Sequence, residues 1–126
     1  MLTRKTLVLV LMMAAGLFCA YAADVTGKWT AQLDTQVGLQ KYTFEFKAEG
    51  ATLTGSANAD IAGTESRSAI QDGKINGNEI SFVEMQKYQG QEVKIVYKGT
   101  VSGDEIKFKR NVADMIDEEF VAKRVK

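Results

Sequence analysis

Histidine and proline are absent from the 126 residues, and cysteine occurs once, as Cys19. Imidazoles and thiolates are the usual ligands of structural zinc and the usual parts of a nucleophile–base pair, so their scarcity argues against both kinds of site. A single thiol also cannot form an intramolecular disulfide. No glycine-rich phosphate loop that opens a helix is found either. We therefore expect no metal, no cofactor and no enzymatic activity.

Neither sign of charge is in excess, because 16 Lys and Arg residues balance 16 Asp and Glu residues. A chain with this balance has no strong attraction for nucleic acid or for an anionic membrane surface. Its length suits one domain with a modest core.

The first 22 residues have the pattern of a secretory signal peptide. Arg4 and Lys5 precede an apolar run over residues 7–18 that is too short to span a bilayer comfortably, and small residues lead to Ala22. We expect cleavage after Ala22 and a single mature domain over residues 23–126, in the periplasm or outside the cell.

A lipoprotein signal centred on Cys19 is the alternative. The bulky Phe18 argues against it, since such signals place Gly or Ala before the cysteine. Cleavage after Ala22 would remove two of the 16 basic residues and leave 14 against 16 acidic ones, a net charge of −2.

Apolar and polar residues alternate with period two through most of the remaining chain, which is typical of strands with one buried face. Ile70 and Ile75 have opposite parity, so a bulge is expected near Asp72 and Gly73. Eight strands are predicted, at residues 29–33, 42–47, 53–59, 66–75, 80–86, 93–101, 106–112 and 120–124.

Two similar stretches indicate how these strands are connected. GKINGNEISF begins at Gly73, and GTVSGDEIKF begins 26 residues later, at Gly99. Each has the pattern of a hairpin with glycine at the reversal. A meander of eight such strands has two exposed edges unless it closes, so we predict an all-β, antiparallel up-and-down β-barrel. A two-sheet sandwich is the alternative, but it usually needs longer crossovers.

The stretch NVADMIDEE, residues 111–119, is the only one with helical spacing. Val112, Met115 and Ile116 fall on one side, and Asn111 with Asp114 could cap its start. We expect a short helical turn or loop before the last strand, either as a plug that completes the core or as a mobile lid.

The two ends of the predicted domain carry Gly27 and Trp29 in the first strand and Arg124 in the last. This pattern resembles the lipocalin-like (calycin) barrels, and most closely their short exported bacterial members. The resemblance implies that these three residues form a structural latch, in which a guanidinium–indole contact contributes about 0.5–2 kcal/mol. Some of the proteins that it resembles are periplasmic inhibitors of secreted proteases, and others have no assigned role.

Pairing the strands through their turns predicts a polar cluster on the inner face. Two-residue turns at 89–90 and 103–104 set Phe82 and Arg110 opposite Tyr97, and Phe108 opposite Gly99. Glu84, Tyr97 and Arg110 then share the face that Phe82 and Phe108 line. The cluster could anchor the head group of a small ligand. Alternatively, Glu84 and Arg110 pair with each other inside a filled barrel.

The outward positions carry Lys94, Lys98, Lys107 and Lys109, with Lys98 opposite Lys109. These lysines could attract an acidic partner or simply keep the sheet soluble. Charged outward positions argue against a membrane-embedded barrel, which needs an apolar outer band.

Val83, Met85 and Val96 form a small apolar patch on the same outer surface. Scattered apolar surface residues are normal, so we expect a monomer or a weak dimer.

Two non-catalytic functions fit these observations. In the first, the exported barrel holds a small, partly apolar or amphipathic ligand, with Glu84, Tyr97 and Arg110 as anchors. In the second, the barrel is a rigid filled scaffold that binds a protein or a polysaccharide through its N-terminal arm, its loops or its outer face. Inhibition of an exported enzyme is one form that this second function could take.

Overall fold

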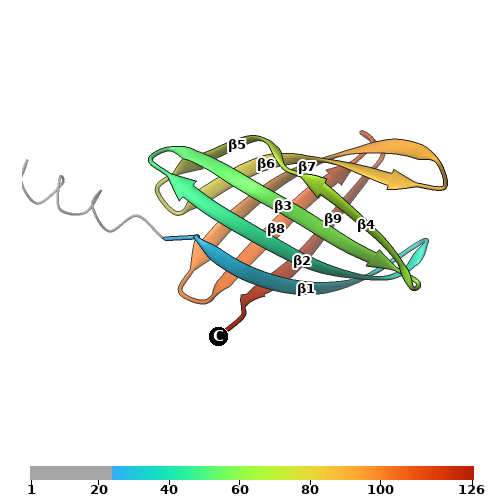
Figure 1. Ribbon diagram of the computed structural model, residues 1–126, viewed down its shortest axis with the longest axis horizontal. Helices are drawn as coiled ribbons and strands as arrows, with labels where there is room; N and C mark the ends of the chain where they lie inside the picture. The colour runs from blue at the N-terminus through green and yellow to red at the C-terminus, as the bar shows by residue number, and fades with distance from the viewer. Residues whose placement is uncertain (1–23) are drawn as a thin grey trace, which may run out of the picture.

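The computed structural model describes residues 24–126, and its regular structure is all β (Figure 1). None of these residues forms a helix long and apolar enough to cross a membrane. The expected signal peptide, with Cys19, lies outside the described residues. The strands are β1 (Gly27–Thr35), β2 (Gly38–Glu49), β3 (Thr52–Ile61), β4 (Thr64–Ala69), β5 (Gln71–Asn76), β6 (Glu79–Tyr88), β7 (Gln91–Ser102), β8 (Glu105–Val112) and β9 (Ile116–Arg124).

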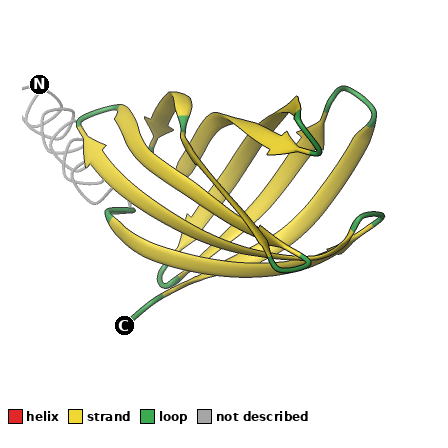
Figure 2. Cartoon of the chain, turned by 45° about the vertical axis from the view of Figure 1, so that its right-hand side comes forward, coloured by secondary structure: helices red, strands yellow, loops and turns green. Residues whose placement is uncertain are grey.

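The sheet closes into a barrel, as the sequence predicts. Hydrogen-bonded neighbours follow the order β2-β1-β9-β8-β7-β6-β5-β3-β4, and a further pairing joins β2 to β3. Eight strands therefore form the ring. The extra strand β4 pairs with β3, next to the place where β5 pairs with it (Figures 1 and 2). All pairings are antiparallel, so the all-β up-and-down barrel is confirmed.

The fourth expected strand is interrupted at Ile70, which separates β4 from β5, and the predicted bulge lies just beyond it, within β5. The register against β6 shifts between Gln71 and Lys74, and Asp72 has a φ of 53°. A Cβ atom at Gly73 would lie 1.9 Å from the carbonyl oxygen of Leu53, so only glycine permits the close approach to β3. Before the bulge in the chain, β4 pairs with β3 alone, and among the described residues no pairing joins β4 to β6.

The expected helical turn before the last strand is wrong, whereas the loop alternative holds. Residues 113–115 form a tight turn, and β9 begins at Ile116, directly opposite Val112 on β8. Ala113 and Asp114 have φ values of 54° and 59°, which reverse the chain without a helix. Met115 is 81 % exposed, so this turn does not plug the core.

The strands run between two ends, which we call the mouth and the base. The mouth carries the turns at 36–37, 62–63, 89–90 and 113–115, and the base carries those at 50–51, 77–78 and 103–104. The first three mouth turns lie at the right of Figure 1.

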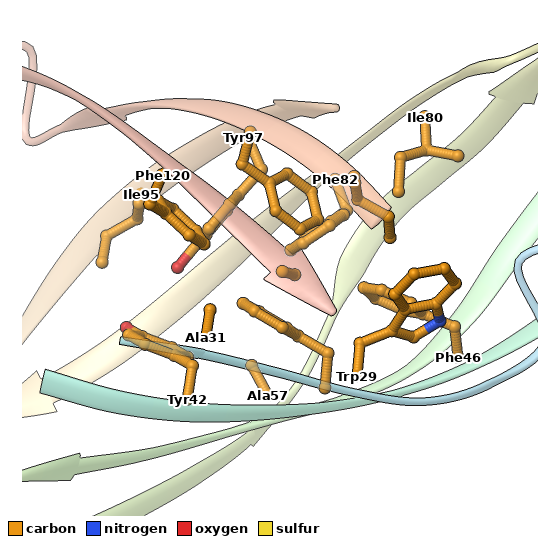
Figure 3. Packing of buried hydrophobic residues seen from close by; sticks show 14 of the residues in the cluster. Trp29, Ala31, Tyr42, Phe46, Ala57, Ile80, Phe82, Ile95, Tyr97 and Phe120 are labelled. Atoms are coloured by element: carbon orange, nitrogen blue, oxygen red, sulfur yellow. The ribbon is translucent and has the colours of Figure 1, made fainter. Parts of the chain in front are cut away.

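Aromatic side chains fill the interior between the two ends. Phe82 stacks on Tyr97 with ring centroids 4.5 Å apart, and Phe44 meets both rings edge-on, at 5.9 and 5.8 Å. Figure 3 shows side chains from the first strands, among them Trp29 and Tyr42, facing those from β6, β7 and β9. Each well-placed aromatic pair adds about 0.5–1.5 kcal/mol to the burial of its area. The interior is thus a packed core at this level.

Candidate functional site

The predicted cross-strand pairs are confirmed and place the polar cluster inside the barrel. Tyr97 pairs with Phe82 on one side and with Arg110 on the other, and Glu84 pairs with Ile95. Glu84, Tyr97 and Arg110 are 1 %, 0 % and 3 % exposed. Three neighbouring strands, β6, β7 and β8, therefore bring these side chains together on the inner face.

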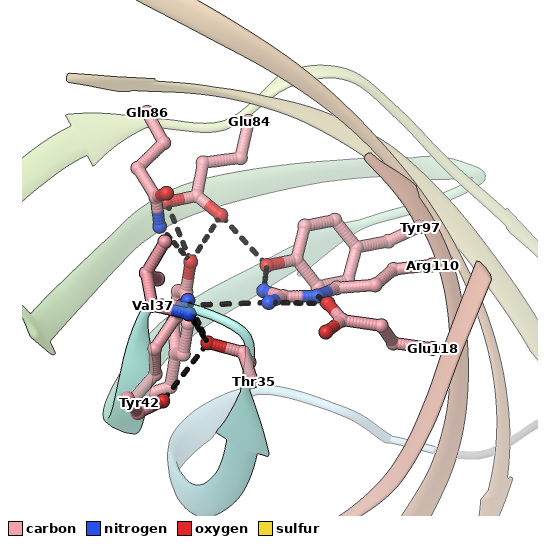
Figure 4. A network of polar contacts seen from close by, with 10 residues as sticks. Thr35, Val37, Tyr42, Glu84, Gln86, Tyr97, Arg110 and Glu118 are labelled. Atoms are coloured by element: carbon pink, nitrogen blue, oxygen red, sulfur yellow. Dashed lines mark hydrogen bonds and ion pairs between the residues drawn. The ribbon is translucent and has the colours of Figure 1, made fainter. Parts of the chain in front are cut away.

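A hydroxyl group connects the carboxylate of this cluster to its guanidinium. Tyr97 donates from Oη to Glu84 Oε1 at 2.6 Å and accepts from Arg110 Nη1 at 3.0 Å (Figure 4). The alternative in which Glu84 and Arg110 pair directly is wrong. Arg110 instead forms its ion pair with Glu118 on β9, whose Oε1 lies 2.7 Å from both Nε and Nη2.

Four further residues complete the network, and sequence reasoning missed them. Tyr42 donates to Glu84 Oε1 at 2.9 Å, and Gln86 donates to the Tyr42 hydroxyl. Gln40 accepts from Arg110 Nη2 at 3.3 Å, and Glu118 is the ion partner of Arg110. The alternation of β2 shows that Tyr42 points inward, but its contact with β6 crosses the barrel between strands that are not neighbours. The role of Glu118 was not predicted because its segment was expected to be a helical turn or loop.

The network links two parts of the barrel where backbone pairing is incomplete. Toward the mouth, residues 31–35 of β1 pair only with β2, and β4 is unpaired with β6 among the residues that the structure describes. The contacts of Gln40 and Tyr42 with Arg110 and Glu84 join β2 to β8 and β6 at that level. Among residues 24–126, every buried side-chain nitrogen or oxygen has a hydrogen-bond partner.

Burial controls the protonation of the network. It raises the pKa of Glu84, although the hydrogen bonds from Tyr97 and Tyr42 and the charge of Arg110 act in the opposite direction. Burial also raises the pKa of Tyr42 and of Tyr97, with the neighbouring Glu84 adding to the effect, so both remain donors. The pKa of Arg110 lies above its ordinary value: burial lowers it, but the two tyrosines and Glu118 favour the cation.

Phe82 and Phe108, the expected apolar lining of the site, are each 1 % exposed. Their rings meet edge-on with centroids 5.9 Å apart. Phe108 also lies against the backbone of Gly99, where a Cβ atom would come within 2.7 Å of its ring. Both rings are therefore fully engaged in the core beneath the polar cluster.

The residues of the implied latch meet where the barrel closes. Arg124 pairs with Trp29 across β9 and β1, and its guanidinium carbon lies 4.3 Å from the centre of the indole ring. Arg124 also donates to the carbonyl oxygens of Thr26 and Asp24, at 2.9 and 2.7 Å. A Cβ atom at Gly27 would lie 3.1 Å from Arg124 Nη1, so glycine leaves room for the guanidinium.

A recess of about 790 Å³ lies at the mouth, between the turns at 62–63 and 89–90. Ile61, Ser66 and Tyr88 line it from strand positions that share the inward parity of Ala59 and Gln86. Arg67, Lys87 and Glu65 bring charges of both signs to its rim. Its volume is in the range of pockets that hold small molecules. Its lining combines apolar and polar groups, as such pockets do.

Comparison of the chain with protein-family models, curated proteins and solved structures finds no match. Among residues 24–126, no group of three His, Cys, Asp or Glu side chains is placed to hold a metal ion. Functional inference therefore depends on the geometry of the barrel itself.

Proposed function

We propose that this protein is a non-catalytic binding protein that takes a small, partly apolar ligand at the mouth of its barrel. The observation that carries this proposal is the 790 Å³ recess, which lies where β4 and β6 are not joined by hydrogen bonds. Ile61, Ser66 and Tyr88 line its inner side, so a ligand there would continue the packed interior rather than displace it.

The filled interior favours a shallow site over a deep one. Phe44, Phe82 and Tyr97 occupy the space that a deep ligand would need. The ligand would instead contact Ile61 and Tyr88, with the buried polar side chains of Gln40, opposite Ile61, and Gln86, two residues before Tyr88, next to them. That Glu84, Tyr97 and Arg110 anchor its head group remains a prediction, in which they act as the polar floor of this site.

The same contacts support the proposal of a non-catalytic role. Glu84 is the carboxylate closest to the tyrosines, and its Oε1 already accepts from both of them. A general acid or base must exchange a proton with the substrate, and a carboxylate that is already engaged by two hydroxyl groups supports a positioning role better than a catalytic one.

Native mass spectrometry of the exported protein, purified without denaturation, tests the proposal. We expect an added mass that disappears on unfolding, and we expect Tyr88→Ala to lose it while remaining folded. Lys47→Ala, which removes an exposed side chain of β2 near the base, is the matched control. A bare protein mass in titrations with fatty acids and other small amphiphiles, together with no effect of Tyr88→Ala, would overturn the proposal.

Residues 1–22 and the latch support the rest of this assignment. We propose that the protein is exported with cleavage after Ala22 and belongs to the lipocalin-like barrels, on the evidence of the signal pattern and of Arg124 lying over Trp29. The mass of the protein from an exported fraction tests the cleavage, which predicts a chain beginning at Ala23.

A second candidate function is favoured by the filling of the interior. A barrel whose buried side-chain nitrogen and oxygen atoms all have hydrogen-bond partners, within the described residues, would be a rigid support for its outer surface. In this role the protein would recognise a protein or a polysaccharide without any ligand inside. Retention of a macromolecular partner by the Tyr88→Ala variant would separate this function from the first.

A further inference from the structure

A groove of about 960 Å³ runs over the outer face of the barrel, on strands β5 to β9. It lies on a different part of the molecule from the mouth recess, and the two share no lining residue. Its charged lining consists of four lysines, Lys74, Lys98, Lys107 and Lys109, and two glutamates, Glu79 and Glu119. The groove is thus positive although the mature domain is expected to be slightly negative.

The strand register concentrates the lysines. Ser81 lies opposite both Lys74 and Lys98, and Lys98 lies opposite Lys109, so three lysines and a serine form one row across β5 to β8. Lys107 lies opposite Thr100 in the next row. Like charges directly opposite each other in a sheet are destabilising, so the Lys98–Lys109 pair is unfavourable in the free protein.

Most of this positive charge is left without a counter-charge. Lys109 lies 3.5 Å from Glu119, but Lys74, Lys98 and Lys107 have no ion pair among residues 24–126. All four lysines are exposed. An anion in the groove would therefore replace repulsion between lysines with attraction.

We propose that this groove binds a polyanionic polysaccharide, a chain of sugars carrying sulfate or carboxylate groups. The proposal extends the second candidate function and does not depend on a ligand at the mouth. Ammonium groups on neighbouring strands would bind successive charges along the chain. Ser81, Thr100 and Asn76 lie between or beside them and offer hydrogen bonds to sugar hydroxyls.

The composition of the groove favours this partner over a protein or a membrane. Protein interfaces are enriched in aromatic residues and arginine and depleted in lysine, whereas the aromatic residues at this groove, Phe108 and Phe120, are only 1 % and 9 % exposed. A membrane surface is broad and flat, whereas this site is a groove, which suits a linear polymer.

Binding of dextran sulfate, with uncharged dextran of the same length as the control polymer, tests this proposal. We expect dextran sulfate to bind, dextran not to bind, and the affinity to fall as salt screens the charges. The double variant Lys98→Gln/Lys107→Gln should bind at least about tenfold more weakly. Lys41→Gln/Lys47→Gln, which removes equal charge from β2 on another part of the barrel, should change the affinity less than about twofold.

Three outcomes would overturn the proposal: no binding of dextran sulfate, an equal loss in the two double variants, or tighter binding to vesicles of anionic lipid than to dextran sulfate. Circular dichroism of each variant confirms that it is folded. Tyr88→Ala tells the two sites apart, because it should leave dextran sulfate binding unchanged. Loss of the mouth ligand alone would thus leave this inference standing.

Discussion

Tyr97 donates a hydrogen bond of 2.6 Å to Glu84 inside a barrel where neither side chain is more than 1 % exposed. The only cation of the network, Arg110, reaches the same hydroxyl from the other side and pairs with Glu118. Glu84 thus has hydrogen-bond donors around it but no cation in contact. Its ionisation should therefore change the free energy of unfolding by a measurable amount.

The first prediction concerns pH. Because burial raises the pKa of Glu84 above its unfolded value, its contribution to stability is complete below the unfolded pKa and is lost as pH rises through the folded pKa. Glu84→Gln keeps an acceptor oxygen for Tyr42 and Tyr97 but cannot ionise. In urea denaturation, we expect the variant to lose less stability than the wild type as the pH rises above the ordinary pKa of a glutamate. Glu92→Gln, at an exposed position on β7, should keep the wild-type profile. Parallel profiles for wild type and Glu84→Gln would contradict the assignment.

The second prediction concerns the buried ion pair. Arg110→Ala leaves Glu118, Gln40 and Tyr97 without their shared donor, and breaking such a pair costs about 3–5 kcal/mol. Guanidinium denaturation measures this loss. Lys109→Ala, one residue away on the exposed face, should change the free energy of unfolding by less than about 0.5 kcal/mol. Similar values for the two variants would show that the network contributes little.

The third prediction concerns the latch. Arg124→Ala removes the contact with Trp29 and the donors to Thr26 and Asp24, and we expect a loss of about 2 kcal/mol. Arg124→Lys should recover only part of it, since one ammonium cannot reproduce the planar fork. Trp29 is the only tryptophan of the chain, so its fluorescence reports both unfolding and any change at the latch. Full stability of Arg124→Ala would rule out a latch.

The fourth prediction separates a steric clash from backbone strain. A Cβ atom at Gly73 would meet the backbone oxygen of Leu53 at 1.9 Å, whereas one at Gly77 meets nothing within 4 Å but sits at a φ of 61°. Gly77→Ala should cost about 1–2 kcal/mol, as alanine does in the left-handed region. Gly73→Ala should cost more, because the backbone of β3 would have to move. The reverse order in thermal unfolding would contradict the close approach at the bulge.

The fifth prediction tests the turn at 113–115. Because Met115 is 81 % exposed, Met115→Ser should change the free energy of unfolding by less than about 0.5 kcal/mol. A loss of 2 kcal/mol or more, the size expected for a buried methionine, would instead support the hypothesis that this segment plugs the core.

The sequence predicts the barrel and its register well because both depend on local patterns. Alternation sets which side chains face inward, and the two-residue turns fix the pairs of Tyr97 with Phe82 and with Arg110. The bulge at Asp72 was readable for the same reason, since opposite parity of Ile70 and Ile75 requires an irregularity between them.

Contacts that cross the barrel could not be predicted in this way. Whether Glu84 meets Arg110 directly or through Tyr97 depends on the curvature of the sheet and on the position of Tyr42 from β2. The helical spacing of residues 111–119 was misleading because a tight turn between Val112 and Ile116 satisfies the same polar residues: Asn111 accepts from the backbone of Asp114 at 3.0 Å.

The pairing of β1 with β9, which joins the first strand to the last, also determines when the barrel can be completed. Every other strand pairing joins neighbours or near neighbours in the chain, whereas the contacts of Arg124 with Thr26 and Asp24 span 98 and 100 residues. Local hairpins form fast, but a closure of this length carries the largest loop entropy and needs the last strand. Until then β1 and β8 both expose unpaired edges, so the nascent protein is most prone to aggregate just before its final strand is added.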